Sequence, residues 1–462
     1  MQFNSISYAL FLPLVFLLYW GLPFQRRNML LVLASFFFYG SWHWGFLALM
    51  IFTGWVNWAA AIGMERTSHR KFMLWSALSV NFLILGTFKY YNFFAESLAE
   101  LLGMFHLSAN MTLLNVILPV GISFYTFQVS GYIVDVYKRK QPVVADIWHF
   151  FAFLSFFPQL VAGPIESAGH LLPQLIRKHQ FDYAMATSGM RLILWGLMKK
   201  MLLADNCGQV ADMIFDNYQT CSTADLWMGA ICFSFQIYGD FSGYTDMAIG
   251  SAKLFGVELM QNFRRPYLSV SIPDFWRNWH ISLMMWFRNY IYIPLGGNKK
   301  GVLKKWRNVF AVFALSGLWH GAGWTYVVWG LYHAALFIPY SFLPVRESES
   351  GLRKVGQIAI TFMLVCMGWV IFRSENMVQA VDYLSGMIVG QNGWQYSYSR
   401  LPILIIVAFF SLELWSKGNN PLDFKCGGWL KYKVVRFFIY FGLFLLTLGM
   451  GGQSAQFIYF QF

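Results

Sequence analysis

Long apolar segments alternate with short polar turns along this chain. Many of these segments approach the roughly 20 residues that an α-helix needs to cross a bilayer. The strands of a membrane β-barrel would instead alternate apolar and polar residues with a period of two. The pattern therefore predicts an all-α polytopic membrane protein with about 11 to 13 transmembrane helices. The expected spans are residues 7–24, two helices within 29–62, then 72–93, 114–136, 183–203, 226–250, two helices within 308–343, 356–373, 401–416 and 434–450.

Two segments depart from this regular pattern. Residues 146–172 are rich in Phe, end at Gly163-Pro164 and carry basic flanks on both sides, which predicts a re-entrant hairpin. Residues 273–292 mix aromatic residues with Arg and Asn and are too polar for a lipid-facing span. We expect this second segment to lie along the cytoplasmic interface or to dip inward from it.

The basic residues predict the orientation of the chain. Cytoplasmic loops of membrane proteins carry an excess of Lys and Arg. Residues 95–112 and 205–225 contain neither residue type, so we expect both loops on the outer side. The N-terminus is then outside as well, and residues 1–24 form a retained first span because no basic segment precedes the apolar run. We expect Lys199 and Lys200 to extend to the surface. The predicted cytoplasmic clusters are Arg26-Arg27 and residues 66–71, 138–140, 299–307, 346–354 and 417–436.

The composition agrees with a membrane protein. The chain of 462 residues is 57% hydrophobic and only 12% charged, against roughly 25% charged residues in an average soluble domain. The net charge of +13 comes from clusters between apolar runs, so we expect the partner to be the lipid bilayer and not nucleic acid. Five cysteines show no metal-ligand spacing, and no metal is expected. We predict a single membrane domain over residues 1–462, with N-terminal helices (1–140), a catalytic core (141–343) and C-terminal helices (344–462).

Two histidines are the strongest candidates for chemistry. His320 lies in Trp319-His320-Gly321-Ala322-Gly323, where glycines allow a close approach of the backbone. His280 lies between Trp279 and Ile281. Ionisable groups inside a membrane are energetically costly, and a neutral imidazole can take a proton from a hydroxyl group. Each histidine also has a structural alternative, a hydrogen bond to a neighbouring helix or at the interface, as we expect for His333.

Other polar groups leave two interpretations open. Asp240 and Asp246 lie six residues apart and therefore on different helix faces, where they either line an aqueous path or brace neighbouring helices. Gln128 is a similar polar residue in an apolar run. Lys304, Lys305 and Arg307, with Lys299 and Lys300, are candidates for binding the phosphates of an acyl donor, although the cytoplasmic charge bias alone also explains the cluster. No nucleophilic serine motif, phosphate-binding loop or dinucleotide fingerprint occurs.

Several motifs together resemble the membrane-bound O-acyltransferase family, in its bacterial branch of alginate and peptidoglycan O-acetyltransferases. The resemblance covers essentially the whole chain. Asn278 and Asn289 depart from it, because relatives often carry Arg and Asp there, which argues against a salt bridge at these positions. The residues that carry the resemblance are Met1 to Ser5, Pro119 to Tyr125, Gly163-Pro164-Ile165, Asp240 to Tyr244, Asp274 to Arg277, Trp279 to Ser282, Tyr292 to Gly297, Trp319-His320-Gly321 and Phe457 to Phe460.

The resemblance implies a helical bundle around a central tunnel, with His320 as the catalytic residue and His280 as its polar partner. It further implies an acetyl donor, acetyl-CoA or another carrier thioester, with no bound cofactor. The acceptor would be an extracytoplasmic polysaccharide or a periplasmic acetyltransferase, and the location the inner membrane of a bacterium. A membrane transporter and a non-catalytic scaffold for a periplasmic acetyltransferase remain alternatives. The candidates for lining the tunnel are Gln128, Asp240, Ser242, Tyr244, Arg277, Asn278 and Trp319.

Overall fold

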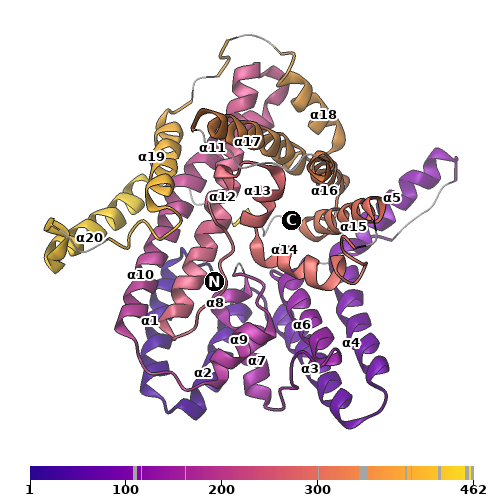
Figure 1. Ribbon diagram of the computed structural model, residues 1–462, viewed down its shortest axis with the longest axis vertical. Coiled ribbons are helices and arrows are strands. Elements are labelled where there is room, and N and C mark those ends of the chain that lie inside the picture. Colours follow the sequence, from indigo (N-terminus) through magenta and orange to yellow (C-terminus); the bar gives the residue numbers. More distant parts are fainter. Residues whose placement is uncertain are drawn as a thin grey trace. The chain divides into compact units, whose positions relative to one another are not determined.

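The computed structural model is built from helices joined by short connections (Figure 1). No β-strand occurs among the residues that the structure describes, and the predicted all-α fold class is confirmed. The chain divides into two compact units, residues 1–186 with 251–260 (unit 1) and residues 187–250 with 261–462 (unit 2). The described residues are 1–107, 112–115, 117–161, 163–299, 301–342, 351–390, 393–396, 398–424, 428–452 and 457–458.

Unit 1 contains most of the apolar helices of the N-terminal half. The predicted break between two helices within residues 29–62 is confirmed, because α2 ends at Gly40 and α3 begins at Trp44. His43 caps α3, since its Nδ1 accepts a hydrogen bond of 3.1 Å from the backbone N–H of Gly45. The helices are α1 (Ile6–Gly21), α2 (Phe24–Gly40), α3 (Trp44–Arg66), α4 (Arg70–Leu85), η1 (Gly86–Tyr90), α5 (Tyr91–Met104), α6 (Ile122–Tyr137), α7 (Ile147–Ser155), α8 (Phe157–Leu160) and α9 (Ala168–Ile176).

Two predicted boundaries in unit 1 are wrong. The span expected at 72–93 does not end there, because α4, the π-helical turn η1 and α5 form a continuous helix from Arg70 to Met104. Residues 94–104 are mostly Ala, Leu and Glu, which favour helix, so nothing stops it earlier. The next helix begins at Ile122 and not near 114, because Pro119 lacks an N–H and Gly121 has a left-handed backbone with φ of 75°.

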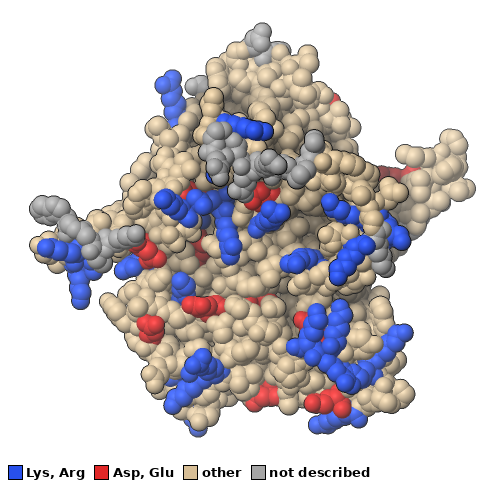
Figure 2. Space-filling model, in the orientation of Figure 1, with Lys and Arg blue, Asp and Glu red and all other residues tan. Residues whose placement is uncertain are grey.

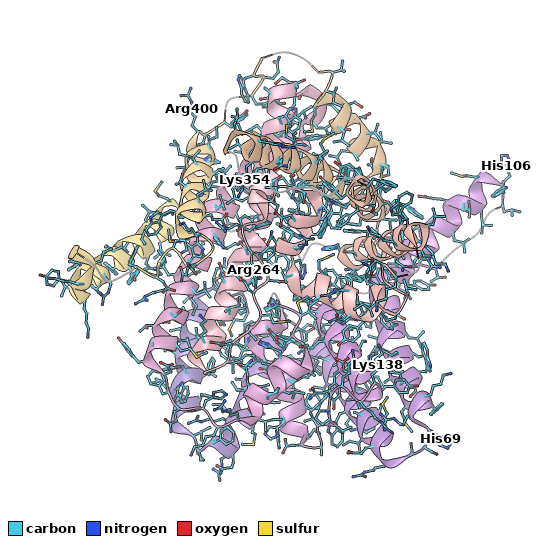
Figure 3. The ribbon with its side chains drawn as sticks, in the orientation of Figure 1. His69, His106, Lys138, Arg264, Lys354 and Arg400 are labelled. Carbon is cyan, nitrogen blue, oxygen red and sulfur yellow. The ribbon has the colours of Figure 1, made fainter. Side chains whose placement is uncertain are left out.

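The two ends of this long helix differ in their basic residues, and the predicted orientation of the chain stays a prediction. In Figure 3, His69, in the turn before α4, and His106, after α5, lie at opposite ends of it. At the His69 end, Arg70 donates hydrogen bonds to the carbonyl oxygens of Val136 (3.0 Å) and Tyr137 (3.1 Å). The basic turn after α3 therefore lies against the basic end of α6, and Figure 2 shows Lys and Arg side chains gathered over this part of unit 1.

Residues 146–172, expected to form a re-entrant hairpin, form a broken helix, and the re-entrant path itself stays a prediction. Three short helices, α7, α8 and α9, replace one continuous span. Side chains bury and hold its backbone: Phe157 N–H donates to Ser35 Oγ (3.0 Å), and the Gln128 side chain donates to the carbonyl oxygen of Phe153 (2.8 Å). Such backbone is tolerated at membrane depth where protein surrounds it.

Unit 2 contains the segment with both candidate histidines. The loop predicted at 205–225 is wrong, because residues 205–216 form α11. Helices α10 and α12 contribute residues to both units. The helices of unit 2 are α10 (Tyr183–Met198), η2 (Lys199–Ala204), α11 (Asp205–Asp216), η3 (Tyr218–Thr220), α12 (Thr223–Leu254), η4 (Pro266–Leu268), α13 (Ile272–Asn278), α14 (Ile281–Phe287), η5 (Arg288–Tyr292), α15 (Val302–His320), α16 (Trp324–Leu336), η6 (Pro339–Ser341), α17 (Gly351–Arg373), α18 (Met377–Gly386), α19 (Leu401–Ser416), η7 (Gly428–Lys431) and α20 (Lys433–Met450).

Several helices have the length and composition of membrane spans. Four described segments qualify by both criteria: α3, the continuous α4–α5 helix, α17 and α20. The shorter helices α1 and α19 are also apolar. In Figure 3, Arg400, which precedes α19, and Arg264 lie toward opposite ends of that helix. Lys300, Cys426, the loop residues 346–350 and the tail residues Tyr459 and Phe460 lie outside the described residues, and the count of 11 to 13 spans stays a prediction.

Helices α15 and α16 form the hairpin that positions His320. Their predicted meeting point near Gly321 to Gly323 is confirmed, since α15 ends at His320 and α16 begins at Trp324. A Cβ atom at Gly317 would collide with the carbonyl oxygen of Tyr326, and one at Gly330 would collide with that of Phe313. The two backbones therefore touch directly, as at glycine-containing helix contacts in membranes.

The substitution Gly330→Ala is expected to separate α15 from α16 and to lower the free energy of unfolding by about 1–3 kcal/mol, the usual effect of overpacking. The measurement is thermal unfolding of the purified protein in detergent. Gly356→Ala is the matched control, because a Cβ at Gly356 in α17 meets no atom within 4 Å. Equal melting temperatures for the two variants would contradict the direct backbone contact.

Candidate active site

His280 occupies a tight connection between two short helices. Helix α13 begins after Ser271, whose hydroxyl accepts a hydrogen bond of 3.2 Å from the backbone N–H of Asp274. It ends at Asn278, and α14 begins at Ile281, so only two residues join the helices. His280 turns the chain with a left-handed backbone (φ 45°, ψ 53°), a conformation that few residues other than glycine adopt. This turn places the imidazole in the interior, where it is fully buried.

Asn262 holds the His280 ring. Its Oδ1 accepts hydrogen bonds from Ser282 N–H (3.1 Å) and Ser282 Oγ (2.9 Å), and it lies 3.3 Å from His280 Nδ1. Because a backbone N–H can only donate, Oδ1 is the acceptor, and the hydrogen of His280 is therefore on Nδ1. The backbone adds two bonds, from Ile281 N–H to the Asn262 carbonyl and from Arg264 N–H to the Asn278 carbonyl, each 3.0 Å long.

His320 is held in the same way by a different acceptor. Its Nδ1 lies 2.6 Å from the carbonyl oxygen of Ser316, one turn earlier in α15. A carbonyl oxygen can only accept, so the hydrogen is on Nδ1 and the basic lone pair is on Nε2. Only 3% of His320 is exposed, and Gly321 N–H closes the helix on the Gly317 carbonyl (3.2 Å).

The two histidines meet in one buried site. Their ring centroids are 6.3 Å apart, with the ring planes at 83°. Trp319 contacts both rings, at 5.6 Å from His280 and 4.9 Å from His320. Aromatic side chains complete the surroundings: Phe241 beside His280, and Trp329 and Phe372 beside His320.

Polar atoms beside His320 can bind a substrate. Among the described residues, the buried Ser316 Oγ and Trp329 Nε1 make no hydrogen bond. Ser316 lies one helical turn before His320, and the Trp329 ring centroid is 5.0 Å from that of His320. Buried polar atoms usually have partners, so a hydroxyl or carbonyl group at this position would satisfy them.

A buried ion-pair cluster lies elsewhere in unit 2. Lys200 is 1% exposed in its side chain and pairs with Asp205 (2.8 Å) and Asp240 (2.9 Å), while Lys199 pairs with Asp246 (2.9 Å). The expectation that these lysines extend to the surface is therefore wrong, since the acids of α11 and α12 neutralise them inside the protein. Asp240 also accepts a hydrogen bond of 2.6 Å from Ile458 N–H. Of the two interpretations of Asp240 and Asp246, the bracing of neighbouring elements is the one these contacts support.

The other tunnel candidates of unit 2 occupy different surroundings. Trp319 lies beside both histidines, as described above. Ser242 is buried, and Tyr244 packs on Phe457 with ring centroids 4.3 Å apart. The Asn278 side chain donates to Ser269 Oγ (3.3 Å) and to Asp274 (3.0 and 3.2 Å), so it braces α13. Arg277 is exposed on the other side of α13.

The remaining candidates have other partners. Gln128 belongs to unit 1, where it binds the Phe153 carbonyl. At the start of α15, Lys304 is exposed, Lys305 Nζ donates to Ser341 Oγ (3.0 Å) and Arg307 donates to Asn308 Oδ1 (2.9 Å). None of these contacts tests a role in tunnel lining or donor binding, which stays a prediction.

Sequence reasoning missed Asn262, Ser316 and the aromatic side chains around His320. Asn262 precedes His280 by 18 residues, and no periodicity links the two. The contact with Ser316 could have been predicted from the sequence, because a residue four positions before a histidine in a helix presents its carbonyl oxygen on the same helix face. Among the described residues, no group of three His, Cys, Asp or Glu side chains forms a metal site.

The chain is similar to a family model and to several known proteins. Residues 136–377 match the model of the membrane-bound O-acyltransferase family. The chain is 41% identical to the probable alginate O-acetylase AlgI of Pseudomonas putida over 437 residues, which cover 90% of this chain and 88% of that protein. It is 37% identical to the peptidoglycan O-acetyltransferase of Helicobacter pylori over 83% of this chain and 78% of the other. It is also 27% identical to the teichoic acid D-alanyltransferase of Bacillus subtilis, over 79% and 95% of the two chains.

The ion-pair cluster gives a prediction about stability. Lys200→Met is expected to leave Asp205 and Asp240 buried without their cation, which lowers the free energy of unfolding by about 3–5 kcal/mol. The same replacement combined with Asp205→Asn and Asp240→Asn should recover most of the loss, because no buried charge then remains. Thermal unfolding in detergent measures both, with the exposed Lys304→Met as the control. A single variant as stable as the control would contradict the cluster's structural role.

Proposed function

The chain belongs to the membrane-bound O-acyltransferase family, and on this basis we propose that it transfers an acetyl group from a cytoplasmic thioester donor, such as acetyl-CoA, to an extracytoplasmic polysaccharide or a partner acetyltransferase. The observation that carries the proposal is the contact of His280 and His320 in one buried site. Both rings carry their hydrogen on Nδ1, and both basic atoms are Nε2. This arrangement suits proton transfer from a hydroxyl group.

In the proposed reaction, His320 Nε2 takes the proton of the acceptor hydroxyl. The hydroxyl oxygen bonds to the acetyl carbonyl carbon, the carbon–sulfur bond breaks, and the leaving thiolate takes the proton from His320. The Ser316 carbonyl stabilises the transient imidazolium, because it accepts from Nδ1–H throughout. In the alternative route, Nε2 itself bonds the acetyl carbon while the carbon–sulfur bond breaks and the thiolate leaves. In a second step the hydroxyl oxygen bonds the acetyl carbon, the bond to Nε2 breaks, and the hydroxyl proton passes to the thiolate.

The position of the hydrogen on the His280 ring limits the catalytic roles that the sequence left open for this residue. A neutral imidazole with its hydrogen on Nδ1 has only an acceptor at Nε2, so it cannot donate a hydrogen bond to the thioester carbonyl. The single proton of the attacking hydroxyl goes to His320 Nε2, so we assign His280 to positioning the His320 ring, which it contacts. We assign the thioester carbonyl to donors such as Ser316 Oγ or Trp329 Nε1.

The location of donor and acceptor follows the charge pattern. We place the protein in the bacterial inner membrane with its N-terminus outside. Of the three basic candidates at the start of α15, we assign Lys304 and Arg307 to the phosphates of the cytoplasmic donor, because Lys305 instead donates to Ser341 Oγ. Two similar proteins are named for the O-acetylation of alginate and peptidoglycan. These names support a hydroxyl group of an extracytoplasmic sugar polymer as the final acceptor.

His320→Ala is expected to lower acetyl transfer by about 10²–10⁴-fold, the usual contribution of a general base. The measurement is release of labelled acetyl groups from acetyl-CoA by the purified protein, and O-acetylation of cell-envelope polysaccharide in cells. His69→Ala, an exposed turn residue of unit 1, is the control. Unchanged turnover in a folded His320→Ala protein would refute the assignment. Substrate flux in liposomes without acetyl transfer would favour a transporter, and normal polymer acetylation by the variant would favour a scaffold.

Asn262→Ala is expected to lower acetyl transfer by roughly a hundredfold, because His280 loses its acceptor and a displacement of about 1 Å is enough for such a loss. The assay is the same, with the melting temperature measured in parallel. Asn92→Ala is the matched control, since Asn92 also makes two side-chain bonds, both 2.9 Å, to the backbone of Leu114. Equal activity of the two variants would show that Asn262 does not position His280.

A further inference from the structure

A cavity of about 480 Å³ lies beside α13, α14 and α15, within the range of ligand-binding pockets. Figure 1 shows these helices close together in unit 2. Most of its wall is apolar, with Ile281, Met284, Val309, Phe313 and Phe337 among the contributors. Neither histidine of the candidate active site lines it, so this cavity, here called the lateral cavity, is a separate feature.

Among the described residues, three cations line the lateral cavity: Arg277, Arg288 and Lys305. The same part of the chain contributes no acidic residue to it. Arg277 and Arg288 are exposed and, among the described residues, neither forms an ion pair. Lys305 makes one neutral hydrogen bond, to Ser341 Oγ at 3.0 Å. The cavity thus combines apolar walls with uncompensated positive charge, which fits a ligand with one anionic and one apolar part.

A second cavity of about 230 Å³ shares part of this wall. Pro273, Arg277, Lys305, Val309 and Phe337 line both cavities. Arg277 and Lys305 therefore stand where the two spaces adjoin. A single phosphate group between these side chains would have the apolar wall of the lateral cavity on one side. The more polar second cavity, which includes Tyr340 and Ser341, would lie on the other.

The composition of the walls argues against a polar nucleotide donor in the lateral cavity. A nucleotide thioester carries a base, a sugar and amide groups that require hydrogen-bonding partners. Among the described residues, the walls contain no Asn, Gln, Ser, Thr, Asp or Glu side chain. Their neutral polar groups are the hydroxyl of Tyr292 and the indole N–H of Trp276, which already donates to His333 Nδ1. An acetyl group is also too short to need this apolar volume.

We propose that the lateral cavity binds an anionic phospholipid, with its phosphate between Arg277, Arg288 and Lys305 and part of its acyl chains along the apolar wall. The protein belongs to a membrane-embedded family, so lipid is present at high concentration around it. The charge pattern predicts this side of unit 2 to face the cytoplasm, where anionic lipids attract basic residues. A lipid bound only to the folded protein stabilises it by mass action.

The test compares binding of phosphatidylglycerol and phosphatidylcholine to the purified full-length protein, by native mass spectrometry and by melting in nanodiscs of each composition. We expect the protein to retain phosphatidylglycerol and to melt higher in its presence. Each cation removed should weaken binding on the order of fivefold, and the triple variant Arg277→Gln, Arg288→Gln, Lys305→Gln on the order of a hundredfold. Val309→Trp, which fills the apolar part, should weaken binding without changing the charge.

The control removes exposed cations away from the cavity, with Arg353→Gln and Lys354→Gln in α17. Equal retention of both lipids, or equal loss in control and triple variants, would overturn the proposal. Displacement of bound phosphatidylglycerol by coenzyme A would overturn it in favour of a donor site. Phosphatidylglycerol binding is also measured with the His320→Ala protein. Because lipid binding requires no acetyl transfer, this measurement tests the lipid site independently of the proposed function.

Discussion

The candidate site depends on one constraint: each of two buried imidazoles must place its Nδ1 hydrogen on a fixed neutral acceptor. The Ser316 carbonyl does this for His320 and the Asn262 amide for His280. Neither acceptor carries charge, so neither ring is held as an imidazolium by its Nδ1 partner. The two basic atoms are therefore Nε2 of each ring, and the rest of unit 2 holds the two rings with their centroids 6.3 Å apart.

Two local backbone features provide this orientation. The left-handed turn at His280 brings α13 and α14 within two residues of each other, and the Asn262 segment pairs with that turn through backbone hydrogen bonds. On the other side, direct contact between the backbones of α15 and α16 brings Trp329 against His320. Both features rely on close backbone approach, so small changes in helix position alter the distance between the rings.

Much of the fold, but less of the site, was predictable from the sequence. The length of an apolar segment was enough to predict helices such as α19. The Gly-Ser-Trp-His sequence was enough to predict the break before Trp44. Lys199 and Lys200 were wrongly expected at the surface, because two adjacent lysines predict an exposed position. Two of the acids that neutralise them, Asp240 and Asp246, lie in α12, far away in the chain. Asn262 was missed for the same reason: its contact with His280 is tertiary, and no local pattern encodes it.

The glycine contact between α15 and α16 has a consequence for how the site can vary. Because backbone atoms meet at Gly317 and Gly330, no side chain there can be enlarged or trimmed to adjust the helix separation. The position of His320 relative to α16 is then invariant, while the aromatic faces of Trp329 and Phe372 can change independently around it. The space beside the imidazole can thus be reshaped for a different acyl group with the imidazole itself left in place.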